Sequence, residues 1–110
     1  MDYIQSSSLS GALDQLWYRF LPEMEGRLAI LTSAADAYEA GSLSDAQREE
    51  AHSAAHKLAG VLGTFGLSRG TTLARELEEL YAEPVRHSFL KADQFAAATA
   101  ELRTIVGSRN

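Results

Sequence analysis

The hydrophobic positions of this 110-residue chain recur every three or four residues, which is the spacing of one face of an α-helix. The clearest apolar stripe consists of Met24, Leu28, Leu31, Ala35 and Tyr38. Pro22 suits the first turn of this helix, because its missing N–H needs no partner there, and Gly41 suits its end. The pattern therefore predicts a helix from Pro22 to Gly41. A separate short helix is expected before it, capped by Ser8 or Ser10 and ending near Phe20.

Three further helices are predicted from the same kind of pattern. Ser42 or Ser44 caps the first of them and Gly66 stops it. Ser68 opens the second, and Pro84 closes it because proline cannot continue a helix. The third follows a short loop and runs towards the end of the chain.

That loop is expected from Glu83 to Ser88. The apolar side chains expected to point inward on the three helices are Ala51, Ala54, Ala55, Leu58, Leu62 and Phe65 on the first, Leu73, Leu77, Leu80 and Tyr81 on the second, and Leu90, Phe95, Ala98, Leu102, Ile105 and Val106 on the third. Residues with a branched β-carbon are scarce and never alternate over a run, so no strand is predicted.

Four amphipathic helices joined by short connections predict an all-α fold, an antiparallel up-down four-helix bundle. The additional short N-terminal helix is expected to cap one end of the bundle. A length of 110 residues fits one domain, over residues 1–110, with a modest core. The domain can also be a module of a longer protein.

Composition narrows the classes of function. Ten basic against fifteen acidic residues give a net charge of -5, which argues against nucleic acid or an anionic membrane as the main partner. The chain has no cysteine, and no apolar run approaches the roughly 20 residues that span a bilayer. The first ten residues do not resemble a secretory signal, so a cytoplasmic domain is expected.

His56 is the candidate functional residue, because it lies off the inward stripe of its helix. The positions three, four and seven residues after it share its face, and they are Ala59, Gly60 and Gly63. Two glycines inside a helix each cost roughly 1 kcal/mol relative to alanine. The pattern indicates an exposed imidazole that a bulky partner can approach closely.

An exposed imidazole, largely unprotonated near neutral pH, can attack a phosphoryl group and hold it as phosphohistidine. One ring nitrogen must then be free, while the other donates its proton to a fixed acceptor. The helix after Gly66 returns antiparallel to the histidine helix. On it Glu78 lies beside the inward stripe, which makes its carboxylate a candidate to orient His56.

The run His56-Lys57-Leu58-Ala59-Gly60, followed by Gly66, Leu73 and Leu77-Glu78, resembles the signature of histidine-containing phosphotransfer (HPt) domains, in particular those of multidomain bacterial response regulators. The resemblance implies a helical bundle whose histidine, here His56, exchanges a phosphoryl group with an aspartate of a receiver domain. It implies a histidine kinase as a further possible partner, and magnesium bound by the receiver. No cofactor or metal is expected in this chain, and ATP binding is not expected because a Gly-rich phosphate loop is absent.

Many members of this family have a lysine three residues after the histidine, where this chain has Ala59. Lys57 points about 100° away from His56 on an ideal helix. The negative charge of a phosphorylated His56 is therefore expected to be stabilised by Lys57, by Arg69 or by the partner. The surface expected to contact that partner comprises His52, Lys57, Ala59, Gly60 and Gly63.

Other interpretations stay open on the sequence alone. The bundle can be an interaction module that docks a receiver or another partner without phosphotransfer. His52 and His56 have a spacing that can bind zinc, although no third ligand is evident. Gly60 and Gly63 can permit close helix packing instead of access, and Glu78 can be a solvated charge. As an isolated domain the chain is expected to be a monomer.

Overall fold

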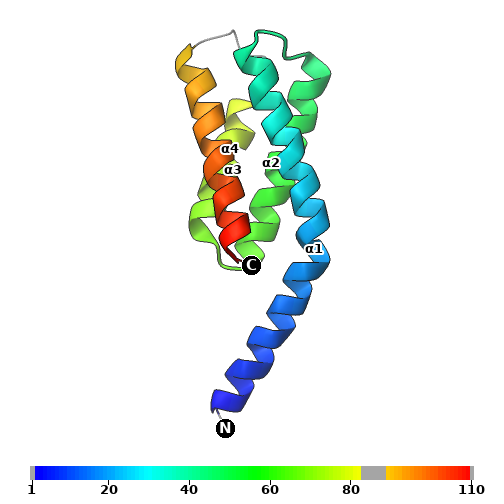
Figure 1. The fold of residues 1–110 in the computed structure, drawn as a ribbon, viewed down its shortest axis with the longest axis vertical. Coiled ribbons are helices and arrows are strands. Elements are labelled where there is room, and N and C mark those ends of the chain that lie inside the picture. The colour runs from blue at the N-terminus through cyan, green and yellow to red at the C-terminus, as the bar shows by residue number, and fades with distance from the viewer. Residues whose placement is uncertain (1, 83–88, 110) are drawn as a thin grey trace.

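The computed structural model describes residues 2–82 and 89–109, and these form four helices and no strand. The helices are α1 (Asp2–Glu39), α2 (Asp45–Thr64), α3 (Ser68–Leu80) and α4 (Phe89–Arg109), as Figure 1 shows. The all-α class is confirmed. The predicted loop from Glu83 to Ser88, with Pro84, lies outside the described residues.

The helices run alternately up and down and close a ring, which confirms the antiparallel four-helix bundle (Figure 1). α1 packs against α2 and α4, and α3 packs against the same two helices on the other side. Two glycines sit at the tight connections: Gly41 after α1 has φ +72° and Gly66 after α2 has φ +71°. Such positive φ values favour glycine, which lacks a β-carbon, at the end of a helix.

The prediction of a separate short N-terminal helix is wrong, because α1 runs unbroken through Pro22. The reason is an apolar stripe that passes the proline without a change of phase, from Trp17 and Leu21 to Met24 and Leu28. Pro22 has no N–H, so the carbonyl of Tyr18, four residues earlier, loses its hydrogen-bond donor within the helix. Tyr18 is 61% exposed, so water can replace that partner. Packing of the stripe thus outweighs the local cost of the proline, about 3 kcal/mol.

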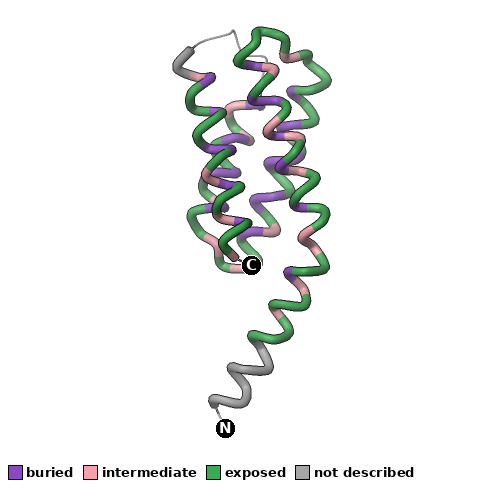
Figure 2. Tube along the Cα trace, viewed as in Figure 1, coloured by how far each residue is buried: buried purple, intermediate pink, exposed green. Residues whose placement is uncertain are grey.

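The core lies along the axis of the bundle, where each helix contributes one buried face (Figure 2). The N-terminal part of α1 projects beyond the other three helices (Figure 1). The largest fully buried side chains are Trp17, Tyr81, Phe95, Met24, Leu31, Leu58, Leu62, Leu77 and Leu102. The predicted inward stripes are confirmed, except that Phe65, Leu80 and Ile105 are only partly buried and the side chain of Leu90 is not described.

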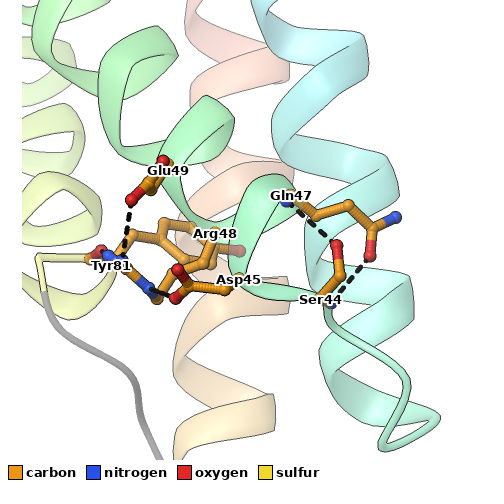
Figure 3. Close-up of polar contacts among 6 residues, drawn as sticks. All are labelled: Ser44, Asp45, Gln47, Arg48, Glu49 and Tyr81. Carbon is orange, nitrogen blue, oxygen red and sulfur yellow. Dashed lines mark hydrogen bonds and ion pairs between the residues drawn. The ribbon is translucent and has the colours of Figure 1, made fainter.

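One charged side chain, Arg48, is buried where α2 begins (Figure 3). Its Nη1 donates to the carbonyl of Tyr81 at 2.6 Å, and its Nε donates to Asp45 Oδ1 at 2.9 Å. Ser44 caps α2 as one of the two serines expected there, and it exchanges hydrogen bonds with Gln47 in a capping box. The start of α2 is therefore tied to the end of α3 by an arginine that the helical pattern did not reveal.

We expect Arg48→Met to lower the free energy of unfolding by about 1.5 to 3 kcal/mol, because it removes hydrogen bonds from a charged donor to a buried carbonyl. Arg19→Met is the matched control. Arg19 is exposed on α1, where substitutions change stability by less than about 0.5 kcal/mol. Urea unfolding followed by circular dichroism measures both variants. Equal stabilities would show that the Arg48 contacts contribute nothing to the fold.

Candidate functional site

His56 stands on the exposed side of α2, with 69% of its side chain open to solvent. The opposite side of the helix is buried in the bundle and consists almost entirely of alanine and leucine. Those buried apolar residues are Ala51, Ala54, Ala55, Leu58, Ala59 and Leu62. Burial of this face fixes the rotation of α2 about its own axis, and it holds His56 out of the core.

Glu78 of α3 contacts the ring of His56 from the side. Its Oε2 lies 2.7 Å from His56 Nδ1, and 21% of the Glu78 side chain is exposed. An ionised carboxylate only accepts hydrogen bonds, so Nδ1 must carry the proton in this pair. In a neutral imidazole with this tautomer the available lone pair lies on Nε2.

The short turn between α2 and α3 brings these two side chains together. Gly66 N–H donates to the carbonyl of Gly63, and Leu67 N–H donates to that of Leu62, which closes the end of α2. On the far side of the turn Thr71 faces Gly63: a β-carbon on the glycine would lie 3.7 Å from Thr71 Oγ1. Seven residues, about two turns, separate Gly63 from His56, and seven separate Thr71 from Glu78. The antiparallel register therefore places His56 and Glu78 at the same level.

A groove of about 590 Å³ runs along the other side of the histidine, between α1 and α2. We call it the His56 groove; it is lined by Leu16, Phe20, Glu23 and Arg27 of α1 and by His56, Lys57, Gly60, Val61, Thr64 and Phe65, which α2 and its C-cap contribute. Apart from its chain neighbours and the backbone of its own helix, no heavy atom lies within 4 Å of the position that a β-carbon on Gly60 would take. The ring thus has a carboxylate on one side and an open, largely apolar groove on the other.

The other residues expected to contact a partner lie differently. The expectation that Ala59 is open beside His56 is wrong, since Ala59 is only 3% exposed. A position three residues away is rotated by about 60°, which is enough to turn it into the core. Gly63 faces Thr71 on α3, and His52 is half-buried, so neither lines the His56 groove.

Of the two cations expected near the histidine, only Lys57 lines its groove. Arg69 pairs instead with Glu101 of α4, with Nε 2.7 Å from Oε2. This hydrogen bond holds the pKa of the Glu101 carboxyl below its usual value and raises that of Arg69. Arg69 therefore belongs to a separate groove between α3 and α4.

The sequence pattern alone did not reveal the contribution of α1 to the site. Leu16, Phe20, Glu23 and Arg27 recur at spacings of four, three and four residues, which is a second stripe beside the buried one. That stripe was hidden because the helix was expected to break at Pro22. Trp17, at the same end, is fully buried and packs edge-on against Phe65 with the ring centres 5.1 Å apart.

The comparison with protein families identifies the bundle. The family model for the Hpt domain matches residues 15–107. The chain belongs to the Hpt domain family. Membership supports a phosphorelay role in two-component signalling, in which Hpt domains act as phosphotransfer carriers rather than kinases. Hpt domains interact with receiver domains and kinases in such phosphorelays.

A relative of this Hpt domain is Protein RcaC of Microchaete diplosiphon, which is 36% identical over 66 residues. The match covers 60% of this chain but only 10% of that protein. No solved structure is significantly similar to the chain. Within residues 2–82 and 89–109, no helix is long and apolar enough to cross a membrane. The same described residues bring together no group of three or more His, Cys, Asp or Glu side chains that could hold a metal ion.

We expect Glu78→Ala to release His56 from a single tautomer, because Nδ1–H loses its fixed acceptor. Reaction of the ring with a small phosphodonor, phosphoramidate, should slow by about twofold to tenfold. Partners behind metal-bound histidines contribute about tenfold to a hundredfold, and here water can replace the carboxylate of an exposed ring. Nitrogen-15 NMR of the His56 ring measures the tautomer directly.

Glu79→Ala is the matched control, since Glu79 is the exposed neighbour of Glu78 and lines the groove between α3 and α4. Both variants remove one negative charge from the same turn of α3. A ring spectrum that changes equally in the two variants would mean that charge, and not the 2.7 Å contact, sets the tautomer.

Proposed function

We propose that this Hpt domain is a phosphorelay carrier that accepts a phosphoryl group on Nε2 of His56 and passes it on. The observation that carries the proposal is the contact between Nδ1 of an exposed His56 and the Glu78 carboxylate. It favours the tautomer whose free lone pair lies on Nε2. Exposure leaves that lone pair accessible to a phosphorylated partner.

In the transfer step, the Nε2 lone pair attacks the phosphorus of an aspartyl phosphate. The bond from phosphorus to the aspartate oxygen breaks, and the aspartate leaves as a carboxylate. The phosphorylated ring keeps its proton on Nδ1 and gains positive charge, which the adjacent Glu78 carboxylate stabilises. The reverse step returns the phosphoryl group to a carboxylate by the same path, so the domain can donate as well as accept.

The proposed partner is a receiver domain, and a histidine kinase is a further possible partner. Phosphoryl transfer needs positioning and neutralisation of the phosphoryl oxygens more than covalent chemistry. In this proposal the receiver supplies the magnesium ion, and the domain supplies the nucleophile and the docking surface. The proposal extends to a cytoplasmic setting and to a parent response-regulator protein.

The His56 groove is the proposed docking surface for the receiver. Its apolar side chains, Leu16, Phe20, Val61 and Phe65, can cover an apolar face of the partner. Gly60 stands one turn after His56 and leaves room for the receiver's aspartate to approach the ring. Lys57 at the edge of the groove offers a cation to an acidic partner.

We expect His56→Gln to fold like the wild type and to accept no phosphoryl group, because the exposed side chain contributes little to packing. The measurement is circular dichroism together with labelling by a phosphorylated receiver. His52→Gln, one turn earlier on α2, is the control and should keep most of the transfer. Label retained in His56→Gln would contradict the assignment of the acceptor. Normal docking without any acid-labile phosphate in the wild type would favour an interaction module instead.

Gly60→Leu should block transfer from a receiver but not labelling by phosphoramidate, which is far smaller than a protein domain. The leucine side chain would stand in open space beside His56, where the receiver must approach. Stability should hold or rise by up to about 1 kcal/mol, since leucine is a better helix former than glycine. Gly107→Leu, at another open glycine on α4, is the matched control. Unchanged receiver-dependent transfer in Gly60→Leu would show that this glycine clears no approach.

A further inference from the structure

A phosphoryl group on His56 would add a charge of about −1.5 to −2 to the edge of the His56 groove. The side chains that line this groove include two cations, Lys57 and Arg27, and one anion, Glu23. Ala59 cannot contribute a charge, and Arg69 is paired with Glu101. We propose that Arg27 of α1 binds the phosphoryl oxygens of phosphorylated His56. This inference rests on the proposed function.

The register of α1 against α2 places Arg27 beside the histidine. Trp17 and Phe65 are in contact at the far end of the groove, with ring centres 5.1 Å apart. Arg27 lies ten residues after Trp17 on α1, and His56 lies nine residues before Phe65 on the antiparallel α2. At about 1.5 Å per residue, the two are displaced from that contact by roughly 15 and 13.5 Å. They therefore stand at nearly the same level, on opposite walls of one groove.

The side chain of Arg27 is suited to reach the reacting nitrogen. Its guanidinium lies towards Glu23, one turn earlier on α1, and rotation about the bonds of the long side chain can turn it towards His56 on the facing wall of the groove. Only 22% of the Arg27 side chain is exposed, so its stem is covered along the groove. Gly60, which lines the same groove, leaves open the space that a side chain would fill there.

The guanidinium of Arg27 is weakly held in this state of the protein. Its Nη2 lies 3.8 Å from Glu23 Oε2, which is an ionic contact beyond hydrogen-bond length. Such an ion pair between residues four apart on a helix contributes little to stability. A phosphoryl group offers three strong acceptor oxygens that match the fork of a guanidinium. Phosphorylation would thus move Arg27 from Glu23 to the phosphoryl group, with Lys57 as a second, more flexible cation.

The test is phosphorus-31 NMR of the domain after phosphorylation by phosphoramidate, titrated between pH 5 and pH 8. A nearby cation favours the dianion and so lowers the second pKa of the phosphoryl group, which is otherwise about 6. We expect Arg27→Gln to raise this pKa by about half a unit, a small shift because the groove is open to water. Glu23→Gln should shift it in the opposite direction, and Arg27→Lys should give an intermediate value.

Arg19→Gln is the matched control, because it removes the same charge from an exposed position on α1 that does not line the groove. A merely structural role of Arg27 would not give opposite shifts in the Arg27→Gln and Glu23→Gln variants. If the phosphohistidine forms but titrates alike in the wild type and in these two variants, the inference is overturned while the proposed function stands. If the wild type forms no phosphohistidine on His56, both are overturned.

Discussion

The close approach of α2 and α3 is the constraint on which the candidate site depends. A β-carbon on Gly70 would lie 3.1 Å from Leu62 Cδ1 and 3.4 Å from Ile105 Cγ2, so a larger residue would push these side chains or α3 itself away. Glu78 stands eight residues further along the same helix, and its short side chain spans the gap to His56 only at this spacing. The contact between His56 and Glu78 thus depends on the packing of α3 at Gly70, about two helical turns away.

The two neighbours of α2 act on opposite sides of the histidine. α3 presents a carboxylate to Nδ1, and α1 forms the far wall of the His56 groove. The second wall requires an unbroken α1, because the residues from Leu16 to Arg27 line the groove on both sides of Pro22. A bend at the proline would separate the apolar end of the groove from Glu23 and Arg27. Continuity of the buried stripe from Trp17 to Met24 therefore matters for the site as well as for the fold.

Periodicity and capping rules were enough to predict the bundle, a serine cap at Ser42 or Ser44 and the turn at Gly66, because each of these depends on neighbouring residues. The pairing of His56 with Glu78 was also accessible, since a short turn fixes the register of the helices that it joins. The break at Pro22 and the exposure of Ala59 were predicted wrongly, because the packing of neighbouring helices decides both. The buried contacts of Arg48 and the place of Arg27 in the His56 groove were not predicted, because a charged residue outside the apolar stripe is normally solvated.

The exposed His56 ring contributes little burial energy, and Gly60 and Gly63, which follow it on α2, weaken the helix by about 1 kcal/mol each. The buried core holds the helices together, and polar contacts join them at both ends of the bundle. At one end Arg48 joins the start of α2 to the carbonyl that follows α3. At the other, Arg109 of α4 lies 5.2 Å above the Trp17 ring and donates to Asp14 of α1 at 2.9 Å. Because both clamps lie away from His56, the surface around the ring can stay open without loss of the register that orients it.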